Sequence, residues 1–491
     1  MPIEKTRPAA GIVHLGLGNF HRAHQAVYTA HAMTAEPGNW GIVGVASNSP
    51  RVVDALREQD LRYTVVELSP DGARFSVPAV HTDAYVAARE PERVVTDLAA
   101  ATTRVVTLTV TEHGYHYSPR TGRLDVEDPT IVADLETLRR GAGAPRSVLG
   151  RIVAAVRRRG AEHATPLTVL SCDNLSGNGD HTGRLVREFA AELPDAEELL
   201  GFLEQRVTFP NSMVDRIVPA TTDAERDLVA AGTGWADRIP VPAEPFSMWV
   251  LEDRFAAGRP AWDRAGAVLS DDVHAYEELK LRLLNGTHSL LAYLGALTGC
   301  PTIPDAAARS EIREAAHRVL REEYLPSVRV PDGVDVDRYE RELFERWDNS
   351  ALGHRCHQVG SDGSVKLRQR IPVPALEALD RGAVPHLLAL TVAGYLTCLA
   401  PLGGFDPGPV AARMGDPVAE RLREAARSCT GGSDLAALAL TDFHLLGDDL
   451  AGREQFTRRV GELVDLLHTA GPAAATAEAL AAPAPVLGET R

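Results

Sequence analysis

The chain has 491 residues, of which 44% are hydrophobic and 24% charged, and its formal net charge is −16. This length predicts two or three domains with substantial cores, and the composition is that of a globular rather than a disordered protein. No apolar run reaches 18 residues and no signal-peptide-like segment opens the chain, so we expect neither a membrane protein nor a secreted one.

The charge balance limits the kinds of partner that the protein can bind, and the cysteines indicate its cellular compartment. Acidic residues outnumber basic ones, 67 to 51, and such a field repels nucleic acid. The five cysteines are scattered without a C-x-x-C pair, which predicts neither a disulfide framework nor a structural zinc site. We therefore expect a cytoplasmic protein with a small-molecule partner, no nucleic acid and no membrane.

Strand-like and helical segments alternate along the first 170 or so residues. The expected strands are 11–17, 40–45, 62–68, 104–111 and 167–171, and the expected helices are 20–33, 51–59 and 152–159. Such alternation is typical of a parallel sheet with helices on both faces.

The pattern becomes helical after about residue 271. Helical spacing of apolar residues marks 276–297, 311–322, 384–399, 418–428 and 453–469, and the end of the chain, 471–491, predicts a weak last helix and a frayed tail. We therefore expect an α/β fold: a Rossmann-type, doubly wound dinucleotide-binding domain over residues 1–270 and a mostly α-helical domain over residues 271–491.

The first expected strand leads into a glycine loop, Gly16-Leu17-Gly18-Asn19-Phe20-His21. In dinucleotide-binding loops the first glycine allows a tight turn and the second lets the pyrophosphate approach the backbone. His21 stands where a third glycine is usual, so we expect helix and strand to pack less closely. Glycines between a strand and a helix also occur in ordinary turns, and it is the βα context that favours a dinucleotide site.

The residues after the second strand bear on the choice between NAD and NADP. An acidic residue there binds the ribose hydroxyls and repels a 2′-phosphate. This chain reads VASNSPR from Val45, without a carboxylate, and Ser47, Ser49 and Arg51 could accommodate a phosphate. A plain polar turn explains these residues equally well, so we expect NAD and keep NADP open.

Two polar clusters are candidates for chemistry. In the expected helix 276–297, Lys280 and Asn285 lie five residues apart, about 140° around a regular helix, and Gly286 can relax that geometry and admit a ligand or another backbone. The alternative makes the charges solvated and His288 a hydrogen-bonded core residue. The second cluster, SCDNLSGNG, comes directly after the strand at 167–171; its asparagines can donate to an alkoxide or carbonyl oxygen, although turn chemistry explains them as well.

Seven stretches then establish a resemblance. They are HLGLGNFHRAHQAVYT from His14, TVTEHGY from Thr109, SCDN from Ser171, TFPNSMVDRIVPAT from Thr208, EPFSMWVLEDRF from Glu244, YEELKLRLLNGTHSLLAYLG from Tyr276 and SDGSVK from Ser361. In these stretches, which span most of its length, the chain resembles the mannitol dehydrogenase family, the polyol-specific long-chain dehydrogenases and reductases that include mannitol 2-dehydrogenase and fructuronate reductase.

The resemblance implies a metal-independent hydride transfer. Lys280 would be the general base, with a pKa that burial lowers toward roughly 7–8. Asn174 and Asn285 would form the oxyanion-binding pair, His288 would orient the substrate, and Glu277 would relay protons to solvent. The resemblance further implies substrate contacts by Asp215, Lys366 and the residue at Gln358, and cofactor contacts by Gly16, Gly18, Asn19, Phe20 and Ser47.

Two departures leave the substrate open. The acidic pair that comes after the second strand in NAD-preferring mannitol dehydrogenases is missing. Gln358 stands where the mannitol enzymes carry an arginine, and the run HRCHQVGSDGSVKLRQR from His354 is more similar to the fructuronate reductase branch. A carboxylate substrate would need a cationic partner, for which Arg355, Arg368 and Arg370 are candidates.

We therefore expect an NAD(P)-dependent oxidoreductase that interconverts a polyol and a ketose of the D-mannitol/D-fructose type. The alternative is D-mannonate/D-fructuronate, with hexitol phosphates and pentitols less favoured. The intact lysine, asparagines and histidine disfavour a catalytically silent dinucleotide sensor. A metal-dependent dehydrogenase with His21 and His24 as ligands is disfavoured because no cysteine or carboxylate cluster accompanies them. Since family members can work as monomers, we expect a monomer or a weak homo-oligomer.

Overall fold

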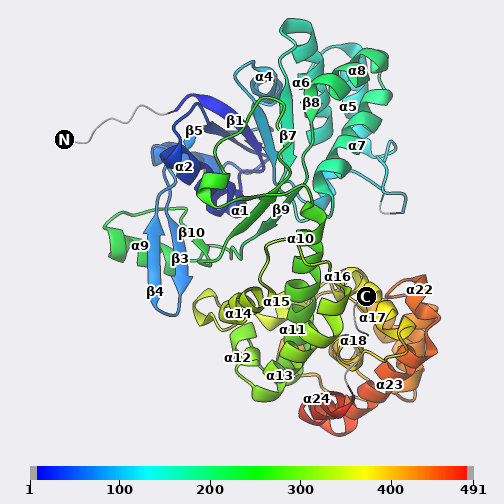
Figure 1. Cartoon of the computed structure of the whole chain (residues 1–491). Coiled ribbons are helices and arrows are strands. Elements are labelled where there is room, and N and C mark those ends of the chain that lie inside the picture. Colours follow the sequence, from blue (N-terminus) through cyan, green and yellow to red (C-terminus); the bar gives the residue numbers. More distant parts are fainter. Residues whose placement is uncertain (1–7, 119, 484–491) are drawn as a thin grey trace. The chain divides into compact units, whose positions relative to one another are not determined.

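The computed structural model describes residues 8–118 and 120–483. The chain divides into two compact units, one ending at His274 and the other beginning at Ala275, and each is described by itself (Figure 1). Within the described part, no helix is both long enough and apolar enough to cross a membrane.

The first unit is built around a six-stranded sheet. Its strands are β1 (Ala10–Leu15), β2 (Gly41–Ala46), β5 (His81–Val86), β6 (Val105–Leu108), β7 (Leu167–Ser171) and β8 (Val207–Thr208). They lie in the order β5-β2-β1-β6-β7-β8, and every neighbouring pair is parallel. This is the strand order of a doubly wound dinucleotide-binding sheet, in which the winding reverses between β1 and β6.

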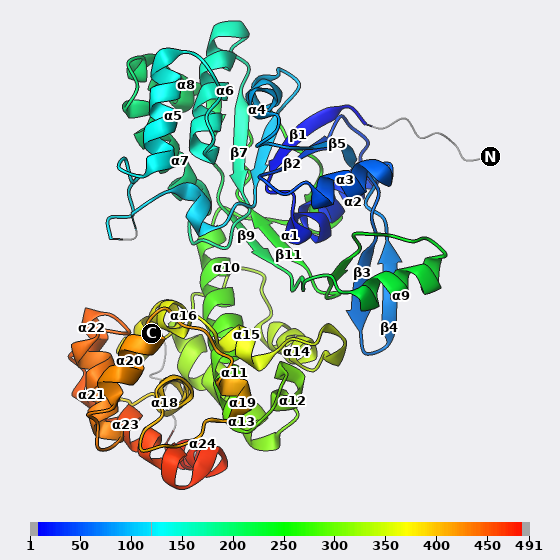
Figure 2. The ribbon, with the colours of Figure 1, turned by 180° about the vertical axis from the view of Figure 1, so that it is seen from behind.

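Alternate residues of these strands belong to different cores. Val13 and Val106 lie in one buried cluster, whereas their neighbours Ile12 and Val105 lie in another, so both faces of the sheet are covered. Figures 1 and 2 show two sets of helices on opposite sides of the sheet. One set is α1 (Asn19–Ala23), α2 (Gln25–Ala35) and α3 (Arg51–Glu58); the other is α4 (Pro91–Ala99), α5 (Pro129–Arg140), α6 (Val148–Glu162), α7 (Asn178–Ala191) and α8 (Ala196–Arg206). The prediction of a Rossmann-type domain is confirmed.

The segment 62–68, expected in the parallel sheet, lies elsewhere. It forms β3 (Val65–Ser69), which pairs antiparallel with β4 (Gly72–Ser76) and parallel with β10 (Val241–Ala243) in a separate sheet. The chain turns back after β3 within two residues, too short a connection for a parallel crossover, and β5 takes the edge position beside β2. A third small sheet contains β9 (Ser212–Asp215), β11 (Met248–Leu251) and β12 (Val268–Leu269), and α9 (Asp223–Thr233) connects β9 to β10.

The helix expected over 20–33 is two helices. The backbone leaves the helical region at His24, with φ −123° and ψ −86°, so that α1 ends at Ala23 and α2 begins at Gln25. The His24 imidazole lies 3.0 Å from the carbonyl oxygen of Met248 on β11, and this contact lies at the break.

From α10 (Val273–Leu279) onward the chain is helical, as predicted. The helices are α11 (Thr287–Leu297), α12 (Ile303–Ala307), α13 (Ser310–Arg318), α14 (Val336–Trp347), α15 (Cys356–Gly360), α16 (Gly363–Arg370), α17 (Pro372–Asp380), α18 (His386–Leu399), α19 (Gly408–Ala411), α20 (Ala419–Ala426), α21 (Gly432–Ala437), α22 (Asp448–Ala451), α23 (Glu454–Thr469) and α24 (Gly471–Ala481). The packed pair α11 and α18 is almost entirely buried and forms the centre of the second unit. The last helix occurs as predicted, and the expected tail, 484–491, lies outside the described residues.

The expected continuous helix 276–297 is interrupted by a different kind of helix. Between α10 and α11, residues Lys280–Gly286 form a π-helix, which we call the π segment. In a π-helix each hydrogen bond spans five residues instead of four, so a residue and the fifth one after it lie about one turn apart. The geometry is thus relaxed in the segment that contains Gly286, and Lys280 and Asn285 lie closer to one face than a regular helix allows.

Candidate functional site

The glycine loop of the first unit needs glycine at its first position for the fold itself. Gly16 has φ +111°, and a Cβ atom there would lie 2.0 Å from the carbonyl oxygen of Thr109 at the end of β6. Its amide and that of Leu17 both donate to the carbonyl oxygen of Val45, at 3.0 and 3.2 Å. The loop is thus fitted closely between β2 and β6, and no residue with a side chain can replace Gly16 without displacing it.

Gly18 differs, because the protein does not demand glycine there. Its φ is −110°, which any residue can adopt, and the nearest atom to a built Cβ is the Gly16 carbonyl oxygen at 3.7 Å. The space beside Gly18 is open, as required where a ligand approaches the backbone. The loop therefore fits a dinucleotide.

Asn19 and Phe20 are held by the protein. The Asn19 side chain donates to the carbonyl oxygen of Pro219 at 3.3 Å and accepts from Arg22 at 2.7 Å. Phe20 stacks on the His24 ring with centroids 5.0 Å apart. Both side chains fix the start of α1.

A cavity of about 240 Å³ opens at the carboxyl ends of β1, β2 and β6, beside the point where the winding of the sheet reverses. Its lining includes Gly16, Ser47, Thr109 and Arg146, and there is no carboxylate among the described lining residues. Open α/β sheets bind ligands at such a point. Ser47, for which a cofactor contact was predicted, lines this cavity.

Three buried histidines lie beneath the loop. His21, in place of the third glycine, stacks on His14 of β1 with ring centroids 3.4 Å apart, and its Nε2 lies 3.1 Å from Nε2 of His81. Burial lowers the pKa of His14 and of His81 to about 3 each, and burial lowers the pKa of His21 as well. Helix and strand are joined here by stacked neutral imidazoles.

The loop after β7 is fixed by Asp173. Its carboxylate accepts from the backbone amides of Val110 and Thr111, at 3.2 and 3.0 Å, and from the Tyr115 hydroxyl at 2.8 Å. Thr111 has φ +69°, a conformation that is strained for a β-branched residue and that persists only where neighbouring groups enforce it. Asp173 thus joins the ends of β6 and β7, and Asn174, the next residue, is exposed.

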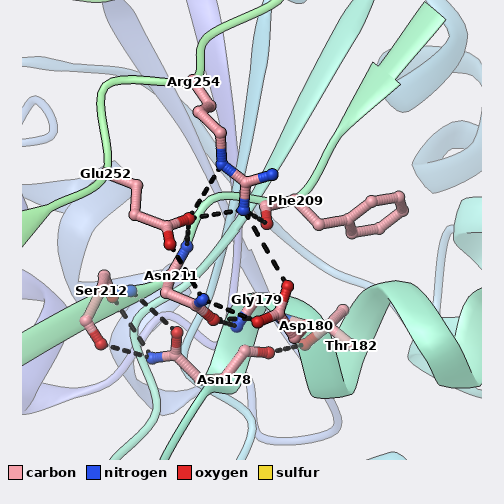
Figure 3. A network of polar contacts seen from close by, with 9 residues as sticks. All are labelled: Asn178, Gly179, Asp180, Thr182, Phe209, Asn211, Ser212, Glu252 and Arg254. Carbon is pink, nitrogen blue, oxygen red and sulfur yellow. Dashed lines mark hydrogen bonds and ion pairs between the residues drawn. The ribbon is translucent and has the colours of Figure 1, made fainter. Parts of the chain in front are cut away.

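Two further asparagines clamp this region (Figure 3). The fully buried Asn178 side chain donates to the carbonyl oxygens of Asp173, at 3.0 Å, and Ser212, at 2.8 Å, and accepts from the Ser212 amide at 2.9 Å. Asn211 accepts from the amides of Gly179 and Asp180, at 2.9 and 3.0 Å. The clamp joins the residue before Asn174 to the start of β9, the strand that ends at the buried Asp215.

The second unit carries the other candidate residues. Lys280 is the first residue of the π segment and Asn285 its second last, and both are half-buried. Glu277 lies on α10, three residues before Lys280, and is also half-buried. A ligand or another backbone was expected beside Gly286, but the neighbour is a side chain. A Cβ atom at Gly286 would lie 2.4 Å from Cζ of Tyr324.

His288 is buried on α11 among cations. Its Nε2 has no hydrogen-bond partner among the described residues, and its ring meets His354 edge-on with centroids 4.8 Å apart. Burial, and after it the charges of His354, Arg370, Arg346 and Lys366, holds the pKa of His288 well below its ordinary value. The buried Nε2 is a polar atom suited to a ligand hydroxyl.

Lys366 and Gln358 lie near one another in the chain but differ in exposure. The Lys366 ammonium donates to the carbonyl oxygens of Ser361, at 2.7 Å, and Val359, at 3.3 Å, and burial and then Arg370 lower its pKa. Gln358 on α15 is exposed. Arg355 and Arg368 are also exposed, whereas Arg370 donates to the carbonyl oxygen of Asn285 at 2.9 Å and to Ser289 Oγ at 2.8 Å.

Sequence reasoning did not identify the residues that support the candidates. Asn178 and Asn211 lie inside polar or family-like stretches, but their spacing does not reveal that they clamp two strands. The sequence suggested Arg370 only as a partner for a carboxylate. Across residues 8–118 and 120–483, no group of three or more histidine, cysteine, aspartate or glutamate side chains could hold a metal ion.

Comparison with known proteins gives matches along both units. Residues 10–264 match the model of the mannitol dehydrogenase Rossmann domain, and residues 272–466 match that of the mannitol dehydrogenase C-terminal domain. D-mannonate oxidoreductase of Escherichia coli K12 is 39% identical over 397 residues, 80% of either chain. Mannitol 2-dehydrogenase of Cereibacter sphaeroides is 40% identical over 421 residues, 85% of this chain and 86% of that protein.

A solved structure is similar over nearly the whole length. Mannitol 2-dehydrogenase of Pseudomonas fluorescens, in a ternary complex with NAD and D-mannitol, aligns with a TM-score of 0.82 and 32% identity. The alignment covers 98% of this chain and 95% of that one.

Proposed function

Because the chain belongs to the mannitol dehydrogenase family of oxidoreductases, we propose that it interconverts a secondary alcohol and a ketone on an open-chain sugar derivative, with NAD or NADP as cofactor. D-Mannitol and D-fructose are the leading pair. The relatives named mannitol 2-dehydrogenase, and the complex of one of them with NAD and D-mannitol, support this choice.

The observation that carries the proposal is the π segment. It sets Lys280 and Asn285 about one turn apart, so that an amine and an amide are presented on neighbouring parts of one helix surface. An amine that accepts the hydroxyl proton and an amide that donates to the same oxygen are the two groups that alcohol oxidation requires.

We assign the roles accordingly. In the oxidation direction Lys280 takes the hydroxyl proton at Nζ, while the amides of Asn285 and Asn174 donate to the oxygen as its charge changes. Glu277 relays the proton toward solvent. When bound, the nicotinamide ring supplies the hydride acceptor. In the reduction direction the Lys280 ammonium and the amide donors polarise the ketone oxygen, so the proposed reaction needs no metal.

We assign the remaining candidate residues to substrate or cofactor binding. We propose that His288 uses its unpartnered Nε2 on a substrate hydroxyl, and that Asp215 and Lys366 contact other hydroxyls. Gly18, beside open space, and Ser47, in the cavity wall, are proposed cofactor contacts. The absence of a carboxylate among the described residues of that wall leaves NADP open beside NAD.

A second candidate substrate pair is D-mannonate and D-fructuronate. The observation that favours it is the set of cations around His288, where Arg346, Arg370 and Lys366 all act to lower the pKa of the imidazole. Such surroundings stabilise an anion, and the relative named D-mannonate oxidoreductase supports a carboxylate substrate.

The test is an absorbance assay at the nicotinamide band, with NADH or NADPH against D-fructose and D-fructuronate in parallel. Oxidation with D-fructose supports the hexitol pair, and preference for D-fructuronate supports the second candidate. Exhaustive chelation beforehand should leave the rate unchanged. Cofactor binding without turnover on either ketone, or on pentuloses, would contradict the proposed activity and favour a dinucleotide sensor.

A further inference from the structure

We propose that Arg370 is a positioning residue that holds the π segment in the shape that sets Lys280 and Asn285 about one turn apart. The inference rests on the proposed function, since it concerns the same lysine and asparagine. The inference goes beyond the proposed function, because it names a side chain outside the π segment on which the alignment of Lys280 and Asn285 depends.

Arg370 is the last residue of α16 and reaches the end of the π segment. One nitrogen, Nη1, donates to the carbonyl oxygen of Asn285 at 2.9 Å and to Ser289 Oγ at 2.8 Å. Ser289 Oγ in turn donates to the same carbonyl oxygen at 3.3 Å. Three polar groups, one each from α16, α11 and the π segment, therefore meet at the backbone of Asn285.

This contact lies near the end of the π segment, where the change of helix type disturbs the backbone hydrogen bonds. When five-residue hydrogen bonds give way to four-residue ones, the register shifts by one and a carbonyl at the junction loses its regular donor. The return to regular helix occurs at Thr287, two residues after Asn285. The arginine and the serine bring two side-chain donors to the carbonyl of the half-buried Asn285 beside this junction, where side-chain donors can replace those that the shift in register removes.

A second contact holds the junction beside Asn285. Tyr324 packs so closely against Gly286 that a Cβ atom there would lie 2.4 Å from the ring. With Arg370 bonded to the carbonyl of Asn285 and Tyr324 packed against the next residue, the end of the π segment is held by two side chains from outside it.

The properties of the guanidinium fit this role. Its Nε is buried and has no hydrogen-bond partner among the described residues, and burial lowers the pKa of Arg370. A buried guanidinium with an N–H group that makes no hydrogen bond is energetically costly. This cost indicates that the Arg370 side chain has a function that a neutral side chain could not perform. Lysine carries its charge on a flexible stem, so it holds a donor at this position less rigidly than the planar guanidinium does.

The experiment compares Arg370→Met and Arg370→Lys with Gln369→Met, a control on the same helix whose side chain is exposed. Three quantities are measured on the full-length protein: kcat and KM with the active ketone, the Kd of the reduced cofactor, and amide hydrogen exchange of peptides covering 280–290. For Arg370→Met we expect kcat to fall about 100-fold, since small displacements of catalytic groups cost that much. KM and the cofactor Kd should change little.

Two further readouts separate positioning from general stability. Exchange should rise in the 280–290 peptides and not in those of α18 or α23, and guanidinium ion at a non-denaturing concentration should restore part of the Arg370→Met rate. Arg370→Lys should lie between Arg370→Met and the wild type, and Gln369→Met should match the wild type in every quantity.

Wild-type kcat in Arg370→Met, or a loss of kcat without added exchange at 280–290, would overturn the inference. If Arg370→Met does not fold, Arg370→Lys decides: reduced kcat with local exchange supports the role, and wild-type behaviour overturns it. If the wild type turns over no ketone, the proposed function fails, while the exchange comparison still decides whether Arg370 holds the π segment.

Discussion

The candidate residues of the two units are supported in opposite ways. In the first unit the supports are largely neutral: the asparagines at 178 and 211, the stacked imidazoles, and backbone amides gathered by Asp173. In the second unit they are cationic, with Arg346, Arg370 and Lys366 near a buried histidine. Neutral amides fix backbones at little electrostatic cost, whereas clustered buried cations are costly unless an anion or a developing negative charge compensates them.

The units also differ in regularity. The first unit places its candidate residues at the ends of strands, parallel ones for the glycine loop, Ser47 and Asn174 and the antiparallel β9 for Asp215, where the sheets supply the geometry. The helical unit obtains its geometry from a departure from the regular helix, the π segment. Loss of a supporting contact lets the π segment relax toward the regular helix, which would move Lys280 and Asn285 farther apart around the axis.

The largest expected effect tests the cationic side of this comparison. Replacement of Lys280 by alanine should lower kcat by about 1,000-fold, within the range for loss of a general base, while binding of the reduced cofactor is retained. Stopped-flow absorbance with the active ketone measures the rate and fluorescence titration the affinity. A small primary amine added to the variant should restore part of the rate, and turnover near that of the wild type would show that another group is the base.

The second prediction concerns the neutral histidines of the first unit. The pKa of His14 and of His81 is about 3 in the folded protein, against about 6.5 in an unfolded chain. The unfolded state therefore binds more protons below pH 6.5, and the free energy of unfolding should fall as the pH falls, by about 2 kcal/mol per histidine at pH 5.

Urea unfolding at pH 7 and pH 5 measures this loss. His81→Gln should lose less between the two pH values than the wild type does, whereas His31→Gln, at an exposed position on α2, should lose as much. An equal loss in all three proteins would refute the assignment to the buried cluster.

The third prediction removes a neutral clamp. Asn178→Asp replaces the amide that donates to the carbonyl oxygens of Asp173 and Ser212 with an acceptor. The free energy of unfolding should fall by about 2–3 kcal/mol, the cost of leaving buried polar groups unpaired. Denaturant titration measures it, with the exposed Asn39→Asp as control, expected within about 0.5 kcal/mol of the wild type. Similar behaviour of the two variants would remove Asn178 from the supports.

The smallest expected effect separates the two glycines of the loop. Gly18→Ala should change the free energy of unfolding by less than about 0.5 kcal/mol, because a Cβ atom meets only one atom, at 3.7 Å. It should weaken the reduced cofactor by about tenfold, or 1.4 kcal/mol. Gly16→Ala should instead destabilise the fold itself. Thermal melts and cofactor titrations distinguish the two, and unchanged cofactor affinity in Gly18→Ala would contradict a backbone approach there.

Hydrophobic periodicity predicts most of the fold. The strand at 167–171 has the bounds of β7, and the parallel sheet and the helical second unit are as expected. Which strands pair is not encoded in a single strand's pattern. Residues 62–68 have the pattern of a buried strand and largely form one, but a two-residue connection directs them into a different sheet.

The site could be predicted only as a set of residue types. The apolar residues of 276–297 keep a helical pattern although part of the segment is a π-helix, so hydrophobic periodicity does not reveal the π segment. The poor alignment of Lys280 and Asn285 on a regular helix was the one indication of an irregular geometry. Arg370 stands at the end of a short helix, yet its contact is with a residue 85 positions earlier. Such contacts depend on tertiary packing, which local spacing does not record.

The contrast between the two glycines has a consequence for sequence design. A procedure that chooses amino acids from the backbone alone would keep Gly16, because conformation and space both demand it, and would readily replace Gly18, because neither does. Versions of this domain that were redesigned in this way would be stable, but we expect them to bind the cofactor poorly. In the function that we propose, the second glycine serves the cofactor rather than the fold, so a redesign has to keep it deliberately.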